Sequence, residues 1–156
     1  MDKIPLPKAI DELKVLVVDN QALIHDLIKS ALLELGVKQV SSAQNAFHAV
    51  RLCQQDTFDV VLLAFNVSSD KDGFHLFEEL KHNNYIGDKS TVVFLSAETS
   101  MELVNCIIEL QPDDFWVKPL DASRVQQRFN YLLNIRRKLH KVMHCMDNGD
   151  YAAAIY

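Results

Sequence analysis

Short runs of consecutive apolar residues alternate along the chain with longer stretches in which apolar residues recur every three or four positions. Three runs, at residues 14–19, 59–64 and 91–96, are continuous and rich in β-branched residues, which is typical of parallel strands buried on both faces. Residues 40–43 and 114–117 predict a weaker second strand and a short fifth strand. The pattern therefore predicts five strands.

The stretches between these runs predict helices, because their apolar residues follow the helical period. Asn45 is a candidate N-cap, while Gly36 and Pro112 are stop signals. The predicted helices cover residues 21–35, 45–54, about 74–80, 101–110 and about 123–146.

Five strands that alternate with five helices predict right-handed βαβ units and a parallel sheet covered on both faces, an α/β fold. In such sheets, ligands bind beyond the carboxyl ends of the strands. The residues at those ends are Asp19, Asn20, Ala64, Ser96, Lys118 and Pro119.

Five motifs occur in these elements: the strand ending at Asp19, the strand ending at Ala64, Asp72-Gly73-Phe74, Phe94-Leu95-Ser96-Ala97 and Lys118-Pro119. Their order and spacing resemble the CheY-like receiver domains of bacterial response regulators, over about residues 12–135. The resemblance implies a three-layer, doubly wound sheet with strand order 2-1-3-4-5. It also implies a signalling module of two-component (phosphorelay) systems rather than an enzyme.

In that family, an Asp on the third strand accepts a phosphoryl group from a phosphohistidine, and Mg²⁺ is held by this Asp and an acidic pair. Ala64 stands at the acceptor position. Asp19 and Asn20 stand at the acidic pair, and Asn66 supplies the backbone carbonyl position. Two of three carboxylates are therefore missing, and since Mg²⁺ prefers hard anionic oxygens, Asp19 alone is expected to bind it weakly. No cofactor is required.

The remaining pocket positions match the family. Ser96 corresponds to the phosphate-binding hydroxyl and Lys118 to the phosphate-binding lysine, Phe115 corresponds to the mobile switch aromatic, and Pro119 implies a cis Lys-Pro bond. We expect Lys118 to pair with Asp19 without phosphate. The adjacent Phe115 and Trp116 are expected to face opposite sides of their strand.

The main functional interpretation is an atypical receiver that is not phosphorylated and acts through protein–protein contacts. One alternative is a phospho-accepting receiver whose acceptor Asp has been replaced by Ala64. Another is an anion or small-molecule sensor that uses the vacated pocket. Ser68 and Ser69 are weaker candidates as substitute acceptors.

The last predicted helix is longer than a small sheet can cover. Val125, Phe129, Leu132 and Leu133 are expected to pack on the sheet, whereas a second apolar stripe has no sheet beneath it: Ile135, Leu139, Val142, Met143 and Met146. The predicted organisation is an N-terminal segment (1–12), a receiver-like domain (13–135), a helical extension (136–147) and the start of a further helix or domain (148–156).

Charge divides the chain in the same way. Residues 1–121 carry ten basic and 19 acidic residues, whereas residues 122–146 carry six basic residues and none that is acidic. The whole chain, with 156 residues and a formal charge of -5, is typical of one globular domain and not of a dedicated nucleic-acid binder. The basic run at 136–141 is interpreted as a solvated helix face, with contact to nucleic acid or to an anionic surface as the alternative. His140 and His144 have zinc-ligand spacing but no nearby acid, so solvated side chains are preferred.

Expected partners are a sensor kinase, other two-component proteins or an output domain that follows the chain. A homodimer is expected through the fourth-helix, fifth-strand and fifth-helix face or through the long last helix. Three widely spaced cysteines, no signal peptide and no apolar run near 18 residues predict a cytoplasmic protein without a membrane segment.

Overall fold

A computed structural model of the chain describes residues 9–64, 73–87, 90–97 and 101–147. Five parallel strands form one sheet in the order β2-β1-β3-β4-β5, which confirms the predicted α/β architecture. The elements in chain order are a 3-10 turn (Ile10–Glu12), β1 (Lys14–Val18), α1 (Ala22–Leu35), β2 (Gln39–Ala43), α2 (Ala46–Gln55), β3 (Val60–Ala64), α3 (Gly73–His82), β4 (Thr91–Ser96), α4 (Met101–Leu110), β5 (Asp114–Val117) and α5 (Ala122–Asp147).

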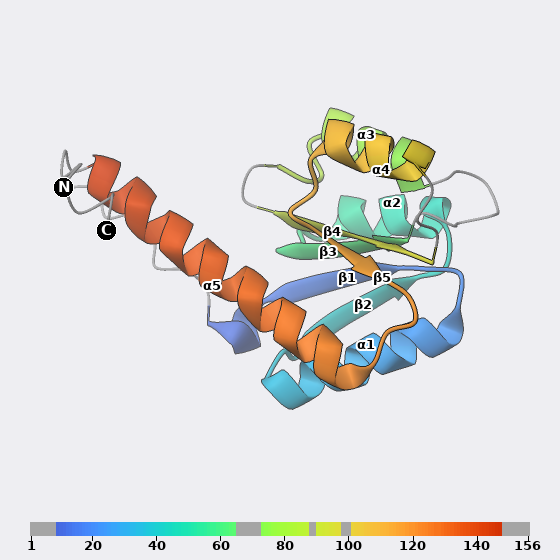
Figure 1. Ribbon diagram of the computed structural model, residues 1–156, viewed down its shortest axis with the longest axis horizontal. Helices are drawn as coiled ribbons and strands as arrows, with labels where there is room; N and C mark the ends of the chain where they lie inside the picture. Colours follow the sequence, from blue (N-terminus) through green and yellow to red (C-terminus); the bar gives the residue numbers. More distant parts are fainter. Residues whose placement is uncertain (1–8, 65–72, 88–89, 98–100, 148–156) are drawn as a thin grey trace.

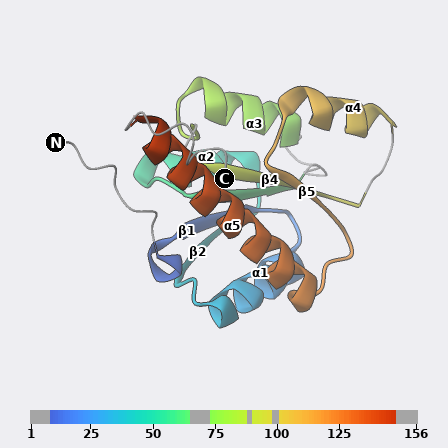
Figure 2. The same cartoon turned by 60° about the vertical axis from the view of Figure 1, so that its left-hand side comes forward.

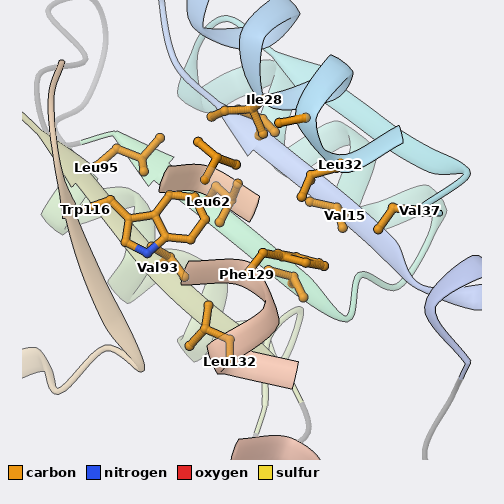
Figure 3. Close-up of a cluster of buried hydrophobic side chains, with 14 of the residues drawn as sticks. Val15, Ile28, Leu32, Val37, Leu62, Val93, Leu95, Trp116, Phe129 and Leu132 are labelled. Carbon is orange, nitrogen blue, oxygen red and sulfur yellow. The ribbon is translucent and has the colours of Figure 1, made fainter. Parts of the chain in front are cut away.

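Two helical layers enclose the sheet, with α1 and α5 on one face and α2, α3 and α4 on the other (Figure 1). Each central strand contributes to both cores, because successive side chains point to opposite faces. Val15 and Val17 pack toward α1 and α5, whereas Leu16 and Val18 join the cluster on the α2 and α3 side. Figure 3 shows the first core, in which Trp116 and Phe129 are the largest side chains. The continuous apolar runs are therefore explained by burial on both faces.

Local signals set the helix ends. The Asn45 side chain accepts a hydrogen bond from the His48 amide at 2.8 Å and caps α2. Asp121 caps α5 in the same way, through the Arg124 amide at 2.7 Å. Gly36 ends α1 with φ at 108°, a left-handed conformation in which a side chain would be strained.

Helix α5 has 26 residues, or about 39 Å at the usual rise, and its C-terminal part extends beyond the sheet (Figures 1 and 2). Its first half packs as predicted, since Val125, Phe129, Leu132 and Leu133 are all buried. Leu139, on the second apolar stripe, is 56% exposed. Met143 and Met146, like His140 and His144, have side chains outside the described part of the structure.

The interpretation of the whole basic run as solvated is wrong at its first residue. Arg136 is half-buried, and its guanidinium donates to the Asp59 carbonyl at 3.1 Å. Because Asp59 lies at the amino end of the sheet, this contact attaches the helix to the domain beyond residue 135. Arg137 and Lys138 are exposed, as expected.

Candidate functional site

The predicted pocket residues meet at one edge of the sheet. Asp19 directly follows β1, Ala64 ends β3, Ser96 ends β4 and Lys118 directly follows β5. The Lys118 amide donates to the Ser96 carbonyl at 2.9 Å, which holds the end of β5 beside β4. Parallel strands thus bring together residues that are up to 99 positions apart.

The centre of the site is a buried ion pair. The Asp19 carboxylate is fully buried and accepts a hydrogen bond from the Lys118 ammonium at 2.7 Å. Its other oxygen accepts from the Gln21 amide at 2.9 Å. A carboxylate away from water needs such partners, because desolvation of an unpaired charge is very costly. The predicted contact between Lys118 and Asp19 is therefore confirmed.

Lys118 is almost as well enclosed, with only 12% of its side chain exposed. Its ammonium also donates to the Gln21 side-chain oxygen at 3.3 Å. One positive and one negative charge balance here, so the Asp19–Lys118 pair is neutral overall. This balance differs from that of a pocket with three carboxylates and one lysine.

His25 belongs to the site although sequence reasoning missed it. It lies on α1, is 7% exposed, and its Nε2 hydrogen-bonds the backbone carbonyl of Asp19. Since a carbonyl only accepts, Nε2 is the donor in this hydrogen bond. Nδ1 has no partner in the part of the chain that the structure describes. The spacing of His25 in the sequence could have indicated its burial, because it lies on the same face of α1 as the buried residues Ile28 and Leu32.

The other matched positions have distinct environments. Ala64 is 2% exposed and presents a methyl group where the family has a carboxylate. Ser96 is fully buried, whereas Asn20 is exposed. The Lys118-Pro119 bond is cis, which confirms that prediction. Asn66, Ser68 and Ser69 lie outside the described residues.

These donors suit Mg²⁺ poorly. Asp19 supplies the only carboxylate among the matched positions, and both of its oxygens already accept hydrogen bonds. In the described residues, no group of three or more His, Cys, Asp or Glu side chains is arranged to hold a metal. Mg²⁺ binds through hard oxygen ligands at near-octahedral geometry, which this set does not supply.

Strand β5 separates the two aromatic residues as predicted. Trp116 is 3% exposed and lies in the core with α5, while Phe115 is partly buried against the opposite core. Phe115, at the switch-aromatic position, therefore lies on the α3 and α4 side of the sheet.

A second polar network, not predicted, joins β5 to α5. The Asp114 carboxylate accepts from the Trp116 indole at 2.8 Å and from two nitrogens of Arg128 at 3.0 and 2.6 Å. This hydrogen bonding raises the pKa of Arg128 above its ordinary value. The same guanidinium lies 5.1 Å from the centre of the Tyr131 ring, so Asp114 positions both α5 and an exposed aromatic.

Several large apolar side chains are exposed over α4, β5 and α5: Met101, Val104, Ile108, Val117 and Tyr131. On α4, Met101, Val104 and Ile108 follow helical spacing and form one stripe. Exposed apolar groups that cluster in this way are typical of contact surfaces. Among the described helices, none is both long and apolar enough to cross a membrane.

The fold and this pocket define the class of protein: a doubly wound α/β domain of the receiver type, with a lysine and an aspartate at the edge where the parallel strands end. Comparison with known families places residues 15–130 in the response regulator receiver domain family. The chain therefore belongs to this family of two-component signalling modules.

Individual relatives agree with this assignment. The chain is 29% identical over 121 residues to the chemotaxis protein CheY of Bacillus subtilis, covering 78% of this chain and 98% of that protein. A probable chemotaxis protein CheY of Rhizobium etli is 25% identical over 116 residues, covering 74% and 88%.

A solved structure shows the same fold. Vibrio cholerae CheY4 superposes with a TM-score of 0.69 at 22% identity, covering 77% of this chain and 98% of that one. NtrX from Brucella abortus gives a TM-score of 0.71 at 24% identity, covering 83% of this chain but only 30% of that chain.

Proposed function

We propose that this receiver domain transmits signals without being phosphorylated itself, through protein–protein contacts in a two-component pathway. The observation that carries the proposal is the methyl group of Ala64, buried at the acceptor position. An acyl phosphate needs a carboxylate oxygen as the nucleophile, and a methyl group has no lone pair to attack phosphorus.

The electrostatics of the pocket support the same conclusion. Incoming phosphoryl groups need their negative charge neutralised, and in this pocket the Lys118 charge is already balanced by Asp19 at 2.7 Å. Asn20, at the second acidic position, is neutral. The pocket therefore supplies neither the nucleophile nor a dense set of anionic oxygens for Mg²⁺.

In this proposal, the Asp19–Lys118 pair holds the domain in one conformation without a phosphoryl group. It connects the end of β1 to the end of β5, and β5 adjoins the exposed surface of α4 and α5. In the proposal, the ion pair replaces the phosphate contact of Lys118. The surface that partners read is then present constitutively.

The proposed partners are a sensor kinase, another two-component protein or an output domain. The proposed contact surface is the apolar stripe on α4 with the adjoining faces of β5 and α5. Met101 and Ile108 are 74% and 66% exposed, and burial of such side chains stabilises an interface by roughly 25 cal/mol per Å² of apolar area removed from water.

Acetyl phosphate with Mg²⁺ tests the proposal on three proteins: the unaltered chain, Ala64→Asp, and Ala64→Asp combined with Asn20→Asp. Intact-protein mass spectrometry is expected to show no phosphoryl adduct on the unaltered chain and an adduct on the double variant. A stable adduct on the unaltered chain contradicts the proposal. Efficient phosphorylation of Ala64→Asp alone favours the alternative that Ala64 replaces an acceptor in an otherwise competent receiver.

A further inference from the structure

The end of α5 is a basic amphipathic arm, defined here as residues 137–147. Leu139 is exposed and Val142 is half-buried, and with Ile135 they follow the spacing of one helix face. Lys138 lies one turn before Val142 on the same side, whereas Arg137 points away, roughly 160° from Leu139 at 100° per residue. The arm therefore presents an apolar stripe with positive charge along one side.

Two such arms would not pair well with each other. The arm carries three basic residues, Arg137, Lys138 and Lys141, against one acidic residue, Asp147, so contact between two arms brings mainly like charges together. Like charges that face each other across an interface disfavour the contact. The charge of the arm instead favours an acidic surface.

An acidic groove of about 690 Å³ lies between α3 and α4, within the range of roughly 300–1,000 Å³ that is usual for binding clefts. Its lining includes three glutamates, with Glu78 and Glu79 from α3 and Glu109 from α4, and two histidines, His75 and His82. Leu110 and Phe77, which is only 3% exposed, form its apolar floor. Lys81 is the only Lys or Arg in the described lining, and it is placed 5.1 Å from the centre of the Phe77 ring. The groove thus combines apolar groups with an excess of negative charge.

We propose that the arm of one copy of this chain docks into the α3–α4 groove of a second copy. Charge complementarity identifies the occupant, since the arm has the apolar stripe and the positive side that the groove would receive. A copy cannot fill its own groove, because α5 is a continuous helix that packs on the opposite face of the sheet and then extends beyond the edge of the domain (Figure 1).

A two-fold arrangement satisfies both contacts at once. Each copy contributes one arm and one groove, so an exchange of arms closes the assembly as a dimer. The contact uses neither the pocket nor the apolar stripe of α4. The inference therefore goes beyond the proposed function and stands whether or not the pocket accepts a phosphoryl group.

Sedimentation velocity of residues 1–156 over a wide concentration range at low ionic strength is the test. The chain is expected to dimerise, and Lys138→Glu is expected to weaken the dimer by about tenfold, because each of two symmetric exposed contacts changes from attractive to repulsive. Arg137→Glu makes the same change of charge on the other side of the arm and is the matched control. Circular dichroism confirms that each variant is folded.

A charge exchange sharpens the test. Glu109→Lys alone is expected to weaken self-association, and an equimolar mixture of Lys138→Glu with Glu109→Lys is expected to restore it in heterodimers. Asp26→Lys, an exposed site on α1, is the control for the groove substitution.

Three results would overturn the inference. The first is a chain that stays monomeric at the highest concentration. The second is a dimer that Arg137→Glu weakens as much as Lys138→Glu, which would indicate unspecific charge effects. The third is a dimer that Met101→Glu disrupts and Lys138→Glu does not, which would place the contact on α4, β5 and α5.

Discussion

Removal of the Lys118 ammonium is expected to destabilise this domain far more than removal of an ordinary surface lysine. Lys118→Met keeps most of the side-chain volume but leaves the fully buried Asp19 carboxylate with a single donor among the described residues, the backbone amide of Gln21. Breaking a buried pair by deleting one partner costs about 3–5 kcal/mol. Because 12% of the Lys118 side chain is exposed and water can partly replace it, we expect the lower end, about 3 kcal/mol.

Lys14 provides the internal control. Its ammonium is 2.8 Å from Asp56, nearly the same separation as in the buried pair, but the two side chains are 31% and 45% exposed. Exposed pairs contribute about 0.2–1 kcal/mol, so Lys14→Met is expected to have a small effect.

Urea unfolding followed by the fluorescence of Trp116, the single tryptophan, measures both variants. A loss of about 3 kcal/mol corresponds to a fall in Tm of roughly 6–12 °C for a domain of this size. The double variant Asp19→Asn with Lys118→Met is expected to recover much of the loss, because no unpaired charge remains buried. If Lys118→Met costs no more than Lys14→Met, the ion pair does not hold the end of β1 to the end of β5.

Three further predictions concern other parts of the domain. Asn45→Ala is expected to lower the free energy of unfolding by about 1 kcal/mol through loss of the α2 cap, measured by urea unfolding with Asn45→Ser as the conservative comparison. Burial raises the pKa of the Cys53 thiol to about 11 from 9.0, so thiol reagents at pH 8 are expected to modify Cys145 before Cys53. The protonated Cys53 also favours folding below pH 9, and this contribution is lost as the pH rises toward about 11. Arg128→Met is expected to cost roughly 1 kcal/mol, since Arg128 is 42% exposed and its pair with Asp114 is partly screened; a loss equal to that of Lys118→Met would contradict this ranking.

Local signals in the sequence were sufficient for most of the fold. The bounds of β4, α4 and β5 were predicted to the residue, since continuous β-branched runs and a proline stop leave little ambiguity. The other elements differ by one or two residues at their ends, where caps and fraying set the boundary. The strand order came from the family resemblance, because periodicity does not specify which strands are neighbours.

Contacts in the site could be predicted where two residues matched to the family's pocket have side chains that attract each other. Asp19 and Lys118 are opposite charges at the same edge of the sheet, and their ion pair followed from that. His25 was missed because its role is a bond to a backbone carbonyl, which side-chain patterns do not show. Likewise, the Arg136–Asp59 contact depends on where α5 crosses the amino ends of the strands, a property of tertiary packing.

Strand β5 connects the pocket to the helix that leaves the domain. Its first residue, Asp114, holds Arg128 of α5, its buried Trp116 packs in the core beside Phe129, and Lys118 directly after it is held by Asp19. The five residues 114–118 thus carry both the lysine of the pocket's ion pair and the anchor of α5. Because packed elements shift as units rather than deform continuously, a change that frees Lys118 must also act on the base of α5. The proposed permanent Asp19–Lys118 pair would then also help to hold α5 in its observed direction.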